Sequence, residues 1–144
     1  TTTRRFEVLN KLRDAGIPTV VWMTPILPFI NDTKENVSGL LDMCIEAKVK
    51  GIICFGMGLT LRDGNREYFY ENLDRLFPGV KEKYIRAYGN QYEISSPNHH
   101  ELWRMFHQRC AQHNIMHDND EIFRYLGEFE DKQAAEQMSL WDLM

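Results

Sequence analysis

The sequence contains little cysteine, and its cysteines are not arranged as a metal site or a disulfide framework. Cys44, Cys54 and Cys110 are the only three in 144 residues, and 10 and 56 positions separate them in turn. These spacings match no CxxC pair and no zinc-finger pattern. We therefore predict no metal ligands in this chain, and an odd cysteine count without a secretory signal favours a reducing cytoplasm.

The sequence also lacks long apolar runs and a strong excess of one charge. No run approaches the ~20 apolar residues that span a bilayer, so we predict no membrane partner. The net charge of -4 provides no general attraction to nucleic acid. The 43% of hydrophobic residues is enough to build a folded core. The chain has the length of one domain, or of part of a larger one.

No start methionine precedes Thr1, and a helical pattern begins almost at once. Apolar residues recur at helical spacing over residues 3–15, before Gly16 and Pro18 end the pattern. We therefore expect the chain to be a piece of a longer protein.

A continuous apolar run predicts a buried strand over residues 19–24, followed by a proline-containing loop over 25–31. Asp32 and Glu35 have the spacing of a capping box, which predicts a helix to about Lys48. A second strand is expected over 51–56. The short connections predict an α/β fold in which the two strands are parallel neighbours. Their outer edges then need partners, either from missing sequence or from another copy of the chain.

Residues after about 60 have a helical character. We predict helices over 67–77 and 80–88, a linker over 90–96, and a helix capped by Ser96 that stops near Asn114. Asp118 or Asn119 is expected to begin a last helix, with Ile122, Phe123, Leu126 and Phe129 facing inward. The predicted domains are residues 1–60 and a helical extension over 61–144.

Several segments together resemble one enzyme family. They are RFEVL at 5–9, AGIP at 15–18, PILPFIND at 25–32 and GIICFGMGLTLR at 51–62. They are similar to the late part of radical S-adenosylmethionine proteins of the branch related to spore photoproduct lyase, often labelled DNA repair photolyase. With the helical tail, this resemblance covers nearly the whole chain.

The resemblance implies a partial (β/α) TIM-like barrel that binds S-adenosylmethionine and a [4Fe–4S] cluster in the full-length protein. This chain would supply the last two strands and a C-terminal extension. The family's cluster motif, CxxxCxxC, is absent from the sequence. No cluster ligand or catalytic residue can therefore be carried over, and the chain alone is expected to be inactive. Its first partner would be the missing N-terminal half of the barrel, and the branch label suggests a DNA substrate.

The resemblance also suggests where ligands would bind. Residues of the loop after the first strand would contact the cofactor, and those after the second strand would line the substrate mouth. The cofactor candidates are Pro25, Ile26, Pro28 and Asn31, and the mouth candidates are Gly56, Gly58, Thr60 and Arg62. The alternative for the first group is a rigid turn beside a helix cap. For the second group it is a flexible strand exit with a solvated arginine.

The C-terminal segment offers a different function. Gln137, Met138, Ser139, Leu140 and Trp141 resemble the short motif that docks bacterial repair proteins on the sliding clamp. The chain would then be a binding module that recruits the enzyme to DNA or to the clamp. The alternative is an end whose Leu140 and Trp141 pack locally. A third hypothesis is a homo-oligomer formed through exposed strand edges.

Overall fold

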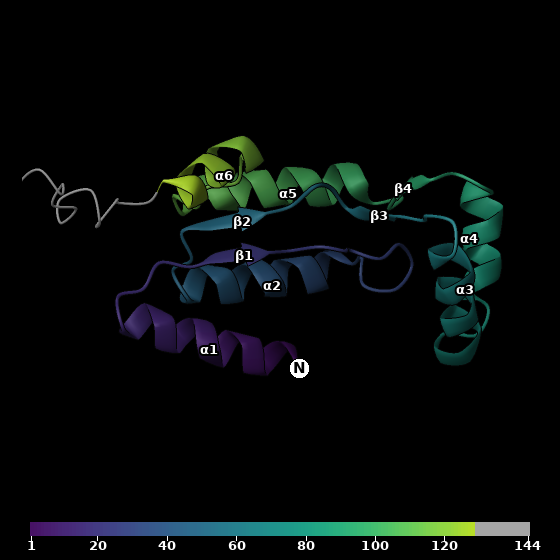
Figure 1. Cartoon of the computed structure of the whole chain (residues 1–144), viewed down its shortest axis with the longest axis horizontal. Coiled ribbons are helices and arrows are strands. Elements are labelled where there is room, and N and C mark those ends of the chain that lie inside the picture. The colour runs from purple at the N-terminus through teal and green to yellow at the C-terminus, as the bar shows by residue number, and fades with distance from the viewer. Residues whose placement is uncertain (129–144) are drawn as a thin grey trace, which may run out of the picture.

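The structure is a computed structural model that describes residues 1–128, which form a mixed α/β arrangement (Figure 1). In chain order its elements are α1 (Thr2–Asp14), β1 (Val20–Trp22), α2 (Lys34–Glu46), β2 (Gly51–Ile53), β3 (Gly58–Thr60), α3 (Asn65–Leu76), α4 (Val80–Tyr88), β4 (Glu93–Ser95), α5 (His99–Gln112) and α6 (Asn119–Gly127). None of these helices is long and apolar enough to cross a membrane.

The parallel pairing of the first two strands is confirmed. β1 and β2 are hydrogen-bonded neighbours, with Val21 opposite Ile52. The second edge of β2 is partly covered by the chain itself, because the Ile52 amide donates to the Met116 carbonyl oxygen at 2.9 Å. Within residues 1–128, no strand pairs with the second edge of β1. The prediction that both outer strand edges need partners from missing sequence or another copy of the chain therefore remains only for the edge of β1.

The main core lies between this sheet, α2 and α5. In the view of Figure 1, α1 and α2 lie below β1 and β2, and α5 and α6 lie above them, while α2 and α5 also pack against each other. The core centres on apolar side chains that are almost completely buried, namely Val37, Leu41, Cys44, Ile52, Leu102, Phe106 and Cys110. By contrast, α1 buries no residue fully.

Residues 58–95 form a second packed unit at one end of the molecule (Figure 1). β3 and β4 pair in antiparallel register, with Leu59 opposite Ile94, and α3 and α4 connect them. The prediction that residues 90–96 form a linker is therefore wrong. The pairing of β4 with β3 is non-local, and three residues are too few to show a periodic pattern.

The predicted cap of α2 is wrong, and the predicted cap of α5 lies two residues before the observed one. Thr33, not Asp32, caps α2, and its side chain accepts a hydrogen bond from the Asn36 amide at 3.1 Å. Asp32 cannot serve because its carboxylate is buried and accepts a hydrogen bond from the Ser96 hydroxyl. Ser96 is not the residue directly before α5, which begins after Asn98, but its hydroxyl accepts a hydrogen bond from the Asn98 amide at 2.9 Å in the turn that leads into the helix.

The predicted cap of the last helix is confirmed, whereas fewer of its side chains are buried than expected. The Asp118 side chain accepts from the Glu121 amide at 2.9 Å. Ile122 is buried, but Phe123 and Leu126 are 44% and 41% exposed, and Phe129 lies outside the described residues. Only the Ile122 side of this nine-residue helix meets β2, at Gly51.

Candidate functional site

A cavity of about 650 Å³ lies where β1 and β2 end, and we call it the mouth cavity. Thr24 and Pro25 line it from the exit of β1, and residues 55–57 line it from the exit of β2. Residues 58–60 and 93–95 form the wall made by β3 and β4, and His99 of α5 completes the lining. The carboxyl ends of parallel strands are a common place for a ligand in α/β proteins. The structure thus brings Pro25 together with Gly56, Gly58 and Thr60.

The two glycines of this cavity are needed by the backbone. Gly56 has a φ of +132°, a conformation that favours glycine. A Cβ on Gly58 would lie 2.0 Å from the Ile94 carbonyl oxygen. Gly58 therefore lets β4 approach β3, which explains its small size without any ligand.

Arg62 does not line the mouth cavity. Its side chain is exposed, and its Nε donates to the Tyr92 hydroxyl at 3.1 Å. The charged residue that does line the cavity is Glu93. The electrostatic character of this wall is therefore acidic, which does not favour a phosphate group.

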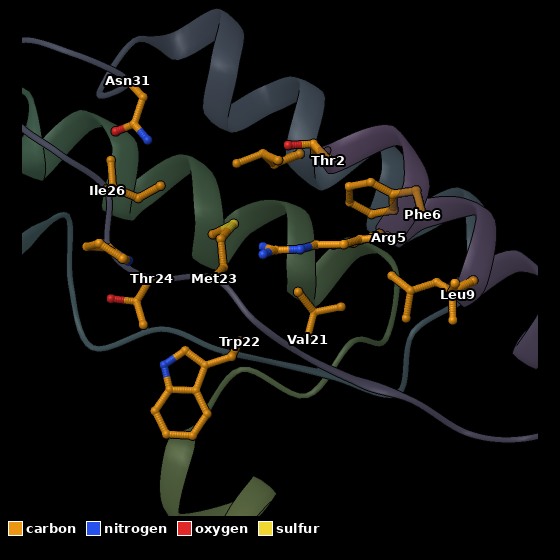
Figure 2. Close-up of a pocket in the computed structure, with 14 residues that line it drawn as sticks. Thr2, Arg5, Phe6, Leu9, Val21, Trp22, Met23, Thr24, Ile26 and Asn31 are labelled. Atoms are coloured by element: carbon orange, nitrogen blue, oxygen red, sulfur yellow. The ribbon is translucent and has the colours of Figure 1, made fainter. Parts of the chain in front are cut away.

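A second cavity of about 480 Å³ lies between α1, β1 and α2, and we call it the helix-side cavity. Figure 2 shows the Arg5 guanidinium reaching from α1 toward Met23, with Phe6 and Leu9 beside it. Trp22 points the opposite way from Met23 in this view. The lining is mostly apolar, so this cavity resembles an incompletely filled space between a helix and a sheet.

The predicted cofactor residues are divided between these places. Ile26 and Asn31 line the helix-side cavity, and Pro25 lines both cavities. The Asn31 Oδ1 accepts from the Leu27 amide at 2.5 Å, so it fixes the loop. Pro28 lines neither cavity, because it is buried against the second unit.

The three cysteines are buried and chemically quiet. Burial raises the pKa of Cys44 and of Cys110 to about 12, and it also raises the pKa of Cys54. Cys54 packs in the main core as a small hydrophobic residue. Within residues 1–128, no three His, Cys, Asp or Glu side chains gather as metal ligands.

An exposed aromatic cluster lies on the sheet face away from α2, and sequence reasoning missed it. Trp22, Phe55 and Phe123 pack together, with ring centroids 5.7–6.5 Å apart. Their side chains are between 44% and 60% exposed. Trp22 alternates along the strand with Val21 and Met23, whose side chains face inward. This alternation is the one local signal in the sequence for the cluster. Phe123 joins the cluster from about 100 positions away, which no local pattern could show.

Sequence reasoning also missed His99 as a residue of the mouth cavity. Its Nδ1 accepts from the Met57 amide at 3.4 Å, and its ring stacks on Trp103 at 5.7 Å. The predicted clamp-docking residues Gln137, Leu140 and Trp141 lie outside the described residues.

Comparison with known proteins gives partial relatives only. Uncharacterized protein Rv2578c of Mycobacterium tuberculosis and uncharacterized protein Mb2609c of Mycobacterium bovis are each 31% identical to this chain over 84 residues. The match covers 58% of this chain and 24% of each relative. No known protein family and no solved structure matches the chain. The chain thus matches about a quarter of the length of these relatives.

Proposed function

We propose that this chain is the C-terminal part of a radical S-adenosylmethionine enzyme of the spore-photoproduct-lyase-like branch. It would contribute the last two strands of a partial barrel and one wall of the ligand mouth. Catalysis would belong to the full-length protein, with the cluster and its ligands supplied by the rest of the chain.

The observation that carries this proposal is the convergence of the two strand exits. The resemblance places ligand contacts after each strand, and Pro25 of the first exit faces the same cavity as Gly56 and Thr60. The strands are parallel, as barrel neighbours must be. Among residues 1–128, one edge of β1 has no paired strand, and a preceding barrel strand would add there.

The described residues fit the two cofactors differently. The mouth cavity has a volume typical of small-molecule sites and mixes apolar walls with a few polar groups. It therefore suits part of S-adenosylmethionine, which supplies the radical chemistry of the family when bound. Thr24, Thr60 and His99 would orient such a ligand, and Phe55 would shield it from water. The buried, high-pKa cysteines do not fit a [4Fe–4S] cluster.

A first test is the coding sequence upstream of Thr1. The proposal predicts a CxxxCxxC motif there. An upstream sequence without this motif would contradict the proposed catalytic function.

A second test measures binding of S-adenosylmethionine to the full-length protein reconstituted with iron and sulfide. Thr24→Val removes a hydroxyl from the wall that the mouth cavity shares with the helix-side cavity, and it nearly preserves side-chain shape. We expect it to weaken binding about tenfold if the hydroxyl hydrogen-bonds the ligand. Thr19→Val, at the other end of β1 and outside both cavities, is the matched control and should bind normally. Equal affinities of the two variants would argue against the mouth cavity as the site.

A further inference from the structure

We propose that His99 donates a hydrogen bond from Nε2–H to the ligand of the mouth cavity. This inference rests on the proposed function and adds a positioning residue that no sequence pattern indicated. It follows from how the ring is held, from which of its nitrogen atoms accepts a hydrogen bond, and from the lack of a partner for the other nitrogen within residues 1–128.

The ring is held from two sides. The Met57 amide donates to Nδ1 at 3.4 Å, and Trp103, one helical turn along α5, stacks against the ring with planes 13° apart. Gly56 lies beside the same edge, since a Cβ built there would be 3.6 Å from the His99 Cε1. The backbone of the β2 exit and the first turn of α5 therefore orient this side chain together.

The Met57 contact selects the tautomer. A neutral imidazole has one donor and one acceptor nitrogen. Because Nδ1 accepts from a backbone amide, the proton of neutral His99 belongs on Nε2. The free nitrogen of the ring is therefore a donor.

That donor is accessible. No residue in the 1–128 region hydrogen-bonds Nε2 of His99, and the one fully buried polar side-chain atom without a partner there is the Tyr70 hydroxyl. His99 is half-buried and lines the mouth cavity. Its Nε2–H is therefore available to an acceptor on a bound ligand, such as a ring nitrogen, a hydroxyl or a carboxylate.

The tautomer is tested first, without any ligand. ¹⁵N NMR of histidine-labelled protein, assigned with His99→Gln, should show His99 as the Nε2–H form at a pH where it is neutral. An Nδ1–H form would overturn the inference whatever the protein binds.

The contact is then tested by titrating the reconstituted protein with S-adenosylmethionine. We expect His99→Ala to weaken binding about tenfold and His99→Gln, which keeps an amide donor, to recover part of the loss. His113→Ala, an exposed histidine at the far end of α5, is the matched control. The His99 Nε2 resonance should also shift on binding in the wild-type protein, which a merely structural role would not produce.

The outcomes separate the two proposals. If the wild-type and both His99 variants bind equally well, the role of His99 is wrong and the proposed function stands. If the wild-type protein does not bind at all, the proposed function fails and this inference fails with it. Circular dichroism melting of each variant shows whether a loss of binding is a loss of folding, and His99→Gln carries the test if His99→Ala unfolds.

Discussion

The Tyr84 hydroxyl donates a 2.7 Å hydrogen bond to the Pro28 carbonyl oxygen, 56 positions earlier in the chain. Both residues are buried, so this bond joins the loop after β1 to the unit made by β3, α3, α4 and β4. Burial, followed by the nearby Tyr88 and Asp32, raises the pKa of Tyr84, which keeps the hydroxyl protonated as a donor. The loop that carries Pro25 is therefore positioned by a helix distant in sequence.

Tyr84→Phe should destabilise the protein, because the Pro28 carbonyl would be left buried without its donor. We expect the free energy of unfolding to fall by about 1–3 kcal/mol. Tyr68→Phe, whose side chain is 70% exposed, is the matched control and should change stability little. Urea denaturation measures both, and an unchanged midpoint for Tyr84→Phe would contradict the structure.

Gly58→Ala should be poorly tolerated, because its Cβ would lie 2.0 Å from the backbone oxygen of Ile94. The β3–β4 pair must separate to admit it, and we expect a loss of about 1–3 kcal/mol or more. The same substitution at Gly39 is the control, since α2 leaves open space there. Gly39→Ala should stabilise the helix by roughly 0.5–1 kcal/mol. In thermal denaturation we expect a lower melting temperature for Gly58→Ala and a higher one for Gly39→Ala. Similar changes in the two variants would refute the close approach of β4 to β3.

Acid should lower the free energy of unfolding of the protein through protonation of His107. Burial lowers the pKa of His107 below its ordinary 6.5. His117, whose ring centroid lies 5.0 Å from that of His107, makes a smaller contribution in the same direction. The unfolded chain then binds more protons than the folded one, so stability rises with pH in this window. The contribution is fully present above pH 6.5 and is lost as the pH falls to the folded pKa.

The measurement is urea denaturation at several pH values between 5 and 8, where histidines titrate. His107→Gln should flatten the dependence, whereas His100→Gln, on the exposed side of α5, should leave it unchanged. A wild-type protein that becomes more stable below pH 6.5 would contradict the assignment.

The three cysteines should resist alkylation in the folded state. All are buried with raised pKa values, and the thiolate is the reactive form. Mass spectrometry after iodoacetamide treatment near pH 8 should find them unmodified in buffer and fully modified in urea. Rapid modification of a native thiol would show that the core between α2 and α5 is open.

Local signals in the sequence identified much of the secondary structure. α4 ends at Tyr88, as the predicted helix over 80–88 does, and Asp118 caps α6, as predicted, because both effects depend on the residue and its immediate neighbours. The apolar run at Val20 became a strand, as predicted, but the prediction that it is buried is wrong, because β1 is only partly buried and Trp22 is 57% exposed. The candidate mouth residues Gly56 and Thr60 do line one cavity with Pro25.

Contacts between distant segments decided the rest. Asp32 has the local spacing of a cap, yet its carboxylate is buried against Ser96, 64 positions away, and Thr33 takes the cap. Glu93–Ser95 becomes a strand only because β3 supplies its hydrogen bonds.

The sequence alone determined the six helices described in residues 1–128 and the first two strands, together with the end of α4 and the start of α6, since these depend mainly on residues a few positions apart. The tertiary structure decided which side chains share the mouth cavity. His99 reaches it because α5 packs on α2 and returns its first turn to the exit of β2. The reason is physical: burial and pairing join residues far apart in the chain, and their energies outweigh a single local preference.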